Sequence, residues 1–424
     1  MSTQIDLEEL TKIEGHATLR LRVDDGRVEH LEIRSLEGSR YFEGILRGRL
    51  YSEASEIATR ICGICSCAHC LAAHQAIENA LGIVPSAQTH ELRRLLNLGE
   101  SIRSHAAHLY FLALPDYLGV PSTLSIALEQ RGAVERAIQL MKLGNDMVRL
   151  LAGRDIHPVS VTVGGHLKIP TQEQLTGIRE RLEQLRPAAV ATAELFNSLP
   201  YPELHVKLER FSLYSDSEYA LIAGSIRSDE HEFEQRDYGK FVSEYHSPEQ
   251  TANFVVREGH AYMVGALSRL ANSKELLSSD AAALLRAGPV PQGLDNPFLI
   301  NPAQAIELVQ NFDDALAILS NLRPEPEPPP EIWVQAGHGI AAVEAPRGVL
   351  WHEYELDDTG HILHANIITP TAQNLRAMEE SLAALLPEVV HEGKEAVVAA
   401  AEKLIRAYDP CLSCAVHFLN VEWL

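Results

Sequence analysis

The chain has 424 residues, of which 46% are hydrophobic and 22% are charged, so it can bury a large core and form one very large domain or two to three ordinary ones. Its 36 basic and 58 acidic residues give a formal net charge of −22, which argues against nucleic acid and anionic membranes as partners, because both require a basic face. We expect no membrane span, because no apolar run reaches about eighteen residues, and no signal peptide, because the N-terminal stretch is acidic.

The first predicted element is a β-hairpin near the N-terminus. Leu19, Leu21 and Val23 alternate with polar residues on one face, and Asp24-Asp25-Gly26 supplies a turn before the alternation resumes. From about residue 52 the hydrophobic period becomes helical. Four long helices are expected, at about 89–119, 128–153, 171–196 and 302–322. The first is expected to end around Pro115 and Gly119, and the third opens with a capping box of Thr171 and Gln174.

The remaining elements follow a proline-rich segment. Residues 323–331 can be neither helix nor central strand and should be extended on the surface. A second hairpin is expected over 348–368 with its turn at 357–360, followed by helices at about 373–386 and 392–408. The fold class is therefore α+β. A central bundle of long helices dominates it, with small peripheral sheets near the N-terminus and around 332–368.

The six cysteines stand in two groups that are far apart in the chain. TRICGICSCAHC holds Cys62, Cys65, Cys67 and Cys70, and DPCLSCAVH holds Cys411 and Cys414. Six cysteines are too few for a disulfide-stapled scaffold of this length, so a reducing, cytoplasmic setting with free thiols is expected. Each group contains a Cys-x-x-Cys pair, a spacing that lets two thiolates point at one metal ion.

Three interpretations of these pairs compete. A structural zinc site usually joins pairs about 12 to 20 residues apart, whereas most of this chain lies between the two pairs. A thioredoxin-like redox pair needs one such motif beside a βαβ unit, and this sequence has two motifs and no predicted unit of that kind. The third is a buried metal site that only the finished fold assembles, where four thiolates favour a soft or borderline transition metal. Cys67 and Cys70 would then be small buried core residues.

The residues that flank the pairs distinguish among these interpretations. Arg60 precedes the first pair and His69 follows it, whereas Asp409-Pro410 precedes the second pair and His417 follows it. Together they resemble the two signature motifs of the large, catalytic subunit of nickel–iron hydrogenases. The resemblance covers the whole chain, because five further segments resemble family segments in the same order: TKIEGHATL, YFEGILRG, GRDIHPVSVTVGG, EAPRGVLWHEYEL and IITPTAQN.

This resemblance implies reversible heterolytic cleavage of dihydrogen at a nickel–iron centre. It implies that all four paired cysteines bind nickel, that Cys65 and Cys414 also bridge to iron, and that Cys62 and Cys411 bind nickel alone. It further implies carbon monoxide and cyanide ligands on the iron.

Residues outside the two cysteine pairs are also implied in binding. Pro370 and Thr371 match the residues that shape the pocket around the carbon monoxide and cyanide ligands. A second metal site, for magnesium or iron, is implied at the Glu43 carboxylate, the Ile367 carbonyl and the His417 imidazole. Imidazole is a less usual ligand for a hard cation than the two oxygen groups are.

Five residues are implied in moving or stabilising charge. Cys411 would accept the proton first and Glu14 would carry it onward, which requires hydrogen-bond distance between them. Arg347 matches an arginine over the open side of the metal pair, where a fixed cation would polarise dihydrogen, and Asp409 would pair with it or hold Cys411. His69 would hydrogen-bond a bridging sulfur. Without the resemblance, Glu14 and Arg347 would be read as surface residues and His69 as a core histidine.

The sequence departs from the family pattern in two places. Ser104 occupies a position where many respiratory members have an aspartate, which would thin the polar groups over the metals. The residues FLNVEWL follow His417, where family precursors usually carry an extension that a protease removes. We expect either an uncleaved chain or a branch that keeps a short tail.

The resemblance also predicts the organisation and the partners of the chain. A single domain is expected, made of a β region at 1–50, a mainly helical part at 51–322, a β-hairpin region at 332–368, the C-terminal helices and metal motif at 371–417, and a tail at 418–424. No cysteines remain for a cluster, so an iron–sulfur small subunit should dock near Cys62 and Cys65. The moderate length and the absence of a membrane span resemble the cytosolic, cofactor-linked branch of the family. A hetero-oligomer is therefore expected, in which electrons pass through NAD(P)-, flavin- or deazaflavin-linked subunits.

One alternative belongs to a different class of function. The quinone-site subunit of respiratory complex I shares the family fold but lacks the four cysteines, and a metal-free or zinc-binding relative would have a structural or assembly role. Metal analysis separates the two, because nickel together with iron indicates a hydrogenase and zinc alone indicates a binding module.

Overall fold

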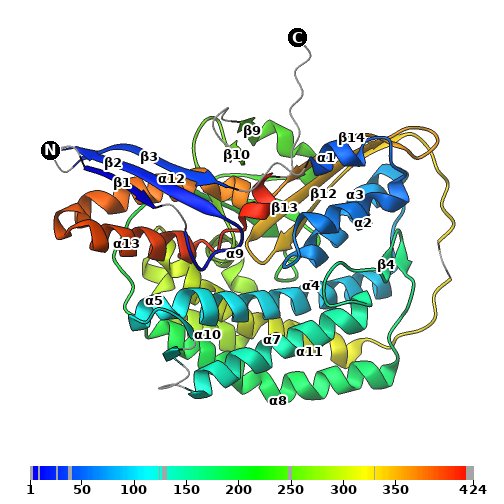
Figure 1. The fold of residues 1–424 in the computed structure, drawn as a ribbon. Coiled ribbons are helices and arrows are strands. Elements are labelled where there is room, and N and C mark those ends of the chain that lie inside the picture. The colour runs from blue at the N-terminus through cyan, green and yellow to red at the C-terminus, as the bar shows by residue number, and fades with distance from the viewer. Residues whose placement is uncertain are drawn as a thin grey trace, which may run out of the picture.

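Four long helices form one layer of the molecule (Figure 1). They are α4 (Ala87–Ala107), α7 (Arg131–Ala152), α8 (Gln172–Asn197) and α11 (Ile300–Asn321). Each of them packs against two of the others, and their inward leucines Leu96, Leu140 and Leu182 are fully buried. The predicted central helix bundle is confirmed. The structure is a computed structural model that describes residues 3–7, 10–24, 27–36, 41–123, 125–126, 131–246, 251–328 and 330–416.

The ends of these helices follow the local signals in the sequence. The Thr171 hydroxyl accepts from the Gln174 amide at 3.3 Å, and the Gln174 side chain accepts from the Thr171 amide at 2.9 Å, so the predicted capping box is present. Helix α4 does not stop at Pro115. It continues as a π-helical segment (His108–Ala113) and the short α5 (Leu114–Leu118), because proline in a first helical turn loses no hydrogen bond. Gly119 ends α5 at φ 66°.

The other helices are shorter or cover the sheets. They are α1 (Phe42–Leu46), α2 (Ala54–Ala58), α3 (Ser66–Leu81), α9 (Ala266–Ser273), α10 (Ser279–Ala287), α12 (Pro370–Val389) and α13 (Lys394–Ala407). The predicted helices at 373–386 and 392–408 correspond to α12 and α13. Apart from Pro329, which lies outside the described residues, the proline-rich segment has neither helix nor strand, as predicted.

The described residues form five small sheets. Their strands are β1 (Thr3–Leu7), β2 (Ala17–Asp24) and β3 (Arg27–Ser35); β4 (Val161–Thr162) and β5 (Gly165–His166); β6 (Glu209–Tyr214), β7 (Ser225–Arg227), β8 (Glu232–Phe233) and β11 (Tyr262–Val264); β9 (Ser243–His246) and β10 (Asn253–Val256); and β12 (Gly337–Ala345), β13 (Gly348–Leu356) and β14 (Ile362–Ile368). Antiparallel pairing is general, except that β11 pairs with β6 in parallel.

Both predicted hairpins are present, as β2–β3 and β13–β14, and each gains a third strand that the sequence analysis did not predict. The analysis also missed the strands of residues 209–264 inside the stretch expected to be mainly helical. These strands are short, and β10 and β11 are buried along their whole length, so they lack the alternation of apolar and polar residues that identifies a half-buried strand.

The two cysteine groups lie where the chain ends converge. The C-terminal segment, red in Figure 1, lies between the N-terminal strands and helix α3. The Glu14 amide donates to the Pro410 carbonyl at 3.4 Å, and the Leu412 amide donates to the Glu14 carbonyl at 3.0 Å. These backbone hydrogen bonds fix the segment around Glu14 alongside the second cysteine pair.

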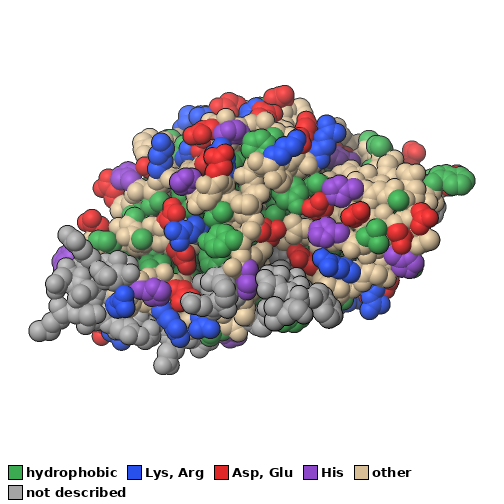
Figure 2. Space-filling view, turned by 90° about the horizontal axis from the view of Figure 1, so that it is seen from above, with side chains coloured by type: hydrophobic (Ala, Val, Ile, Leu, Met, Phe, Trp, Pro, Cys, Tyr) green, Lys and Arg blue, Asp and Glu red, His purple; other side chains and the backbone are tan. Residues whose placement is uncertain are grey.

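The surface carries charges of both signs. On the face in Figure 2, acidic and basic side chains are interspersed, with histidines among them. Within the described ranges, no helix is long and apolar enough to cross a membrane.

Strand β12 packs closely against α3, the helix that begins at the first cysteine pair, and this contact generates a prediction. A Cβ on Gly339 would lie 2.0 Å from the Ala76 carbonyl oxygen and 2.4 Å from the Ala80 amide nitrogen. We expect Gly339→Ala to lower the free energy of unfolding by roughly 1–3 kcal/mol or more, because backbone atoms cannot move aside. Gly177→Ala is the control. A Cβ there meets nothing within 4 Å and should stabilise α8 by about 0.5–1 kcal/mol. Denaturant titrations that find the two variants equally stable would contradict this packing.

Candidate metal centre

The first cysteine pair lies at the N-terminus of α3. Cys62 is in extended backbone after a 3₁₀ turn, and Cys65 is the N-cap residue of the helix. The Cys65 amide donates to the Cys62 sulfur at 3.4 Å. Free amides at a helix N-terminus favour negative charge, so this position favours thiolates.

The second pair follows the end of α13. Asp409 has φ 51°, a left-handed conformation that aspartate tolerates better than most residues, and it turns the chain away from the helix. Pro410 then prevents the helix from continuing. The Cys411 amide donates to the Thr371 hydroxyl at 2.9 Å, and the Cys414 amide donates to the Cys411 carbonyl at 3.1 Å. The pair is therefore held in a tight turn against the start of α12.

The four paired cysteines meet in the interior. Their sulfur atoms all lie within 4.8 Å of one another, and each residue is at most 5% exposed. The Cys62 and Cys411 sulfurs are 3.4 Å apart, as are those of Cys65 and Cys414, so each contact joins the two ends of the chain. A site assembled by the finished fold, which was the third interpretation, matches this geometry.

The remaining two cysteines have the core role expected of them. Cys67 and Cys70 are fully buried and free. The Ser55 hydroxyl donates to the Cys70 sulfur at 3.3 Å, and burial raises the pKa of Cys70 to about 12. An un-ionised thiol in this position is a small core side chain and a poor metal ligand.

The electrostatics of the cluster fit a bound cation. Burial raises the pKa of Cys411 and Cys414 well above the ordinary thiol value, whereas hydrogen bonding from Cys411 and Cys414 lowers the pKa of Cys62 well below it. Four buried thiolates this close repel one another, so they can all ionise only around positive charge. Sulfur ligands favour a soft or borderline metal.

Arg347 supplies a fixed positive charge beside the cluster. Its Nη2 donates to the Asp409 carboxylate at 2.9 Å and its Nε to the Asp409 carbonyl at 2.5 Å. Burial alone would lower the pKa of Arg347, but Asp409 and the cysteine thiolates raise it well above its usual value. Its Nη1 is buried and has no hydrogen-bond partner among the described residues, so the two N–H groups of this nitrogen have no acceptor there.

Glu14 contacts Cys411, as the predicted relay requires. The Cys411 sulfur lies 3.0 Å from Glu14 Oε2, within hydrogen-bond distance. Ser413 orients the same carboxylate, because its hydroxyl donates to Oε1 at 2.5 Å and its amide to Oε2 at 3.3 Å. Glu14 is half-buried, so its carboxylate lies between the cluster and the surface.

Three other predicted residues lie around the cluster. Pro370 and Thr371 are buried in the first turn of α12, where Thr371 holds the Cys411 backbone. His69 is buried, and its Nδ1 lies 3.0 Å from His352 Nε2. His352 Nδ1 in turn lies 2.8 Å from the Tyr354 hydroxyl. The predicted hydrogen bond from His69 to a bridging sulfur stays a prediction.

The second predicted metal site is described only in part. Glu43 Oε1 accepts from the Ile367 amide at 3.0 Å, so these two residues are adjacent. Burial raises the pKa of Glu43 to about 7, against the smaller opposing effects of the Ile367 amide and Arg47. His417 lies outside the described residues, as does the tail that follows it.

The geometry adds residues that the sequence analysis missed. Ser413 was not singled out, although its place between the last two cysteines was a signal that could have identified it. His352 carried no such signal, because its contact with His69 depends on the packing of β13 against α3. Ser104 is buried in α4, and its hydroxyl has no partner among the described residues.

Comparison with known proteins identifies the class. Residues 40–143 and 303–417 match the nickel-dependent hydrogenase family. The alpha subunit of sulfhydrogenase 1 of Pyrococcus furiosus is 35% identical over 98% of this chain and 98% of its own. The beta subunit of the NAD-reducing hydrogenase of Cupriavidus necator is 26% identical over 99% of this chain and 96% of its own.

Solved structures agree with this assignment. The crystal structure of an NAD-reducing nickel–iron hydrogenase in the hydrogen-reduced state aligns with a TM-score of 0.86 at 26% identity, covering 98% of this chain and 99% of that one. The chain belongs to the nickel-dependent hydrogenase family, as a large subunit with the four clustered cysteines of the nickel–iron site. A non-catalytic relative without these cysteines does not fit.

The cluster generates a prediction that separates ligands from spare thiols. Cys411→Ser should abolish both nickel retention and hydrogen turnover, because a hydroxyl does not replace a thiolate as a ligand for a soft metal. Cys67→Ala should keep both, since Cys67 lies outside the cluster and loses only core contacts. Nickel content per chain and hydrogen turnover measure the difference. Equal losses in the two variants would mean that the assignment of the ligands is wrong.

Proposed function

We propose that this chain cleaves dihydrogen reversibly, with Cys411 and Glu14 carrying the proton and Arg347 stabilising charge at the centre. The observation that supports this most directly is the 3.0 Å contact between the Cys411 sulfur and Glu14. Nickel and iron, when held by the four sulfurs, supply the centre at which dihydrogen is split heterolytically. Cys62 and Cys411 would bind nickel alone, and Cys65 and Cys414 would bridge to the iron.

The proton path begins at the Cys411 sulfur. A thiolate there can accept a proton and pass it to Glu14 Oε2 without moving the backbone, because the two atoms are already in hydrogen-bond range. Ser413 holds the carboxylate in that orientation through two hydrogen bonds. Glu14 is half-buried, so it can deliver the proton outward.

Arg347 acts by position and charge. Asp409 accepts two of its hydrogen bonds, which leaves Nη1 free to face the site. A buried guanidinium cannot lose its proton near neutral pH, so it offers a constant positive charge where negative charge develops. Asp409 also precedes the second cysteine pair, and it therefore links the position of the arginine to that of Cys411.

Two further features of the centre are part of the proposal. Carbon monoxide and cyanide would bind the iron, in a pocket bounded by Pro370 and Thr371 at the start of α12. A magnesium or iron ion would bind at Glu43, the Ile367 carbonyl and His417. The adjacency of Glu43 and Ile367 supports this site.

An iron–sulfur small subunit is the expected partner. Only Cys67 and Cys70 remain outside the four paired cysteines, and two cysteines alone cannot hold a four-iron cluster, so electrons must leave through another chain. Ile64, beside the first cysteine pair, is 39% exposed, and Ile156 is 47% exposed. Arg103 donates to the carbonyls of Ile64 and Asp155, which brings the two segments together. Exposed apolar side chains gathered near the centre suit a docking surface.

The onward carrier is proposed by analogy. One relative is named an NAD-reducing hydrogenase, and the same class of carrier, or a flavin or deazaflavin, would receive the electrons here through further subunits. The cytoplasmic location stays a prediction from the sparse cysteine content of the sequence.

The relay is tested by replacing Glu14. Glu14→Gln keeps the size of the side chain and one acceptor oxygen but cannot carry a proton as a carboxylate does. We expect exchange between deuterium gas and water to fall by about 100-fold or more while nickel and iron stay bound, as a proton-transfer group contributes roughly 10²–10⁴-fold. Glu203→Gln, at a side chain 89% exposed, is the control and should keep full exchange. Full exchange in Glu14→Gln would remove Glu14 from the relay.

The ligands of the iron are tested by infrared spectroscopy of the purified complex. Metal-bound carbon monoxide and cyanide absorb in a window where protein does not. We expect bands there in a nickel-replete sample, and their loss in Cys414→Ser, which removes a proposed bridge to the iron. A silent window in the metal-replete parent protein would refute this part of the proposal.

A further inference from the structure

Buried polar side chains of helix α11 reach Asp409 directly, and they reach the turn that carries Arg347 through Arg269. Gln304 and Glu307, one turn apart on α11, face His105 of α4 and His108, the first residue of the π-helical segment that follows α4. His108 Nδ1 lies 2.5 Å from Gln304 Oε1, and His105 Nε2 lies 3.0 Å from Glu307 Oε2. Two separate connections start from this seam, one toward Arg347 and one toward Asp409.

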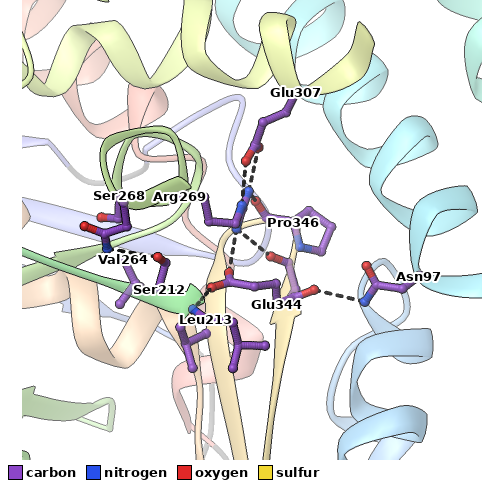
Figure 3. A network of polar contacts seen from close by, with 12 residues as sticks. Asn97, Ser212, Leu213, Val264, Ser268, Arg269, Glu307, Glu344 and Pro346 are labelled. Atoms are coloured by element: carbon purple, nitrogen blue, oxygen red, sulfur yellow. Dashed lines mark hydrogen bonds and ion pairs between the residues drawn. The ribbon is translucent and has the colours of Figure 1, made fainter. Parts of the chain in front are cut away.

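The first connection runs through Arg269 of α9 (Figure 3). Its Nε and Nη2 each donate to Glu307 at 2.6 Å, and its Nη1 donates to Glu344 at 2.7 Å. Nη1 also donates to the Ala345 carbonyl at 3.2 Å, and Nη2 to the Pro346 carbonyl at 3.1 Å. These contacts use all the N–H donors of the guanidinium.

The two carbonyls belong to the residues that immediately precede Arg347. Ala345 pairs with Gly348, so Pro346 and Arg347 form the turn between β12 and β13. The turn is also confined sterically, since a Cβ on Gly348 would lie 2.5 Å from the Val264 side chain and one on Gly265 would lie 2.9 Å from the Arg347 carbonyl. Arg269 therefore clamps the backbone from which the Arg347 side chain extends.

The second connection runs through Gln304. Its Nε2 donates to Asp409 Oδ2 at 3.4 Å, while the other oxygen of that carboxylate accepts from Arg347. Both oxygens of Asp409 therefore have a donor. The carboxylate cannot rotate without losing one of these hydrogen bonds.

Arg269, Glu307 and Glu344 form an ionic cluster that is entirely buried. Arg269, Glu307 and Glu344 are each at most 3% exposed. Burial alone would raise the pKa of Glu307, but Arg269 holds it at about 2, whereas burial raises the pKa of Glu344 to about 7. Apolar residues of similar volume usually stabilise such a core at least as well as a buried ionic cluster does. A cluster that holds the turn of Arg347 therefore indicates a role in positioning.

We propose that Arg269 and Gln304 are positioning residues that fix the Arg347 guanidinium and its Asp409 partner relative to the four cysteines. This inference rests on the charge-stabilising role proposed for Arg347. Misplacing a group by about 1 Å can cost up to roughly 100-fold in rate, so a change in the clamp should be visible in turnover.

The test uses Arg269→Lys, which keeps the charge but cannot reproduce the forked contacts. We expect a fall of about tenfold in kcat with nickel retained, a smaller change in the KM for dihydrogen, and faster amide hydrogen exchange over residues 345–348. The matched control is Arg93→Lys, because Arg93 is equally buried, pairs with Glu78 at 2.8 and 2.6 Å and donates to the Thr162 carbonyl. The control should keep kcat within about twofold and leave exchange at 345–348 unchanged.

Two further variants keep the inference falsifiable. Gln304→Met removes the second connection together with the contact to His108, leaves the contacts of Arg269 in place and adds no charge. It should lower kcat by about threefold to tenfold even if Arg269→Lys fails to fold. Arg347→Lys tests the underlying role. If Arg347→Lys has a normal kcat, the charge-stabilising role proposed for Arg347 is wrong. If Arg347→Lys has a lowered kcat while Arg269→Lys and Gln304→Met both have a normal kcat, the positioning inference alone is wrong.

Discussion

Mutual repulsion among four buried thiolates is the constraint on which the rest of this structure depends. Sulfur atoms within 4.8 Å of one another cannot all carry charge in a dry interior without compensating positive charge. The fold supplies part of it before any metal binds, through the amides at the N-terminus of α3 and the buried guanidinium of Arg347. The surroundings are therefore prepared for a cation bound through sulfur.

The fold meets this constraint by holding segments that are distant in the sequence next to one another through backbone hydrogen bonds and close packing. The Glu14 backbone is hydrogen-bonded on both sides of Cys411, α3 is packed against β12, and Thr371 holds the second pair from α12. In the layer of long helices, Glu307 of α11 contacts His105 of α4 and also Arg269. Arg269 in turn holds the backbone of the turn that contains Arg347. Glu14, Arg347 and the second cysteine pair are thus each held by hydrogen bonds to neighbouring backbone or side-chain groups.

Local patterns were sufficient to predict the helices of the bundle, both hairpins and the Thr171 capping box, because each depends on residues only a few positions apart. The buried strands of residues 209–264 were missed because they lack the alternation of apolar and polar residues. The helical stretch expected at 89–119 is present, but its π-helical segment was not predicted. The four cysteines and Glu14 were predicted from motifs. The seam at Arg269 was not, because its contacts join residues from α9, α11 and β12 that share no sequence signal.

The separation of Cys62 and Cys411 by 349 positions has a mechanical consequence. An ion held by both pairs closes a loop that contains most of the chain, as a disulfide would, and restricts the unfolded ensemble accordingly. Chain-entropy arguments put the effect of so long a loop at about 5–6 kcal/mol. The metal centre would then also stabilise the fold as a cross-link. Removing its ion would destabilise the packing of segments that lie far from the four cysteines.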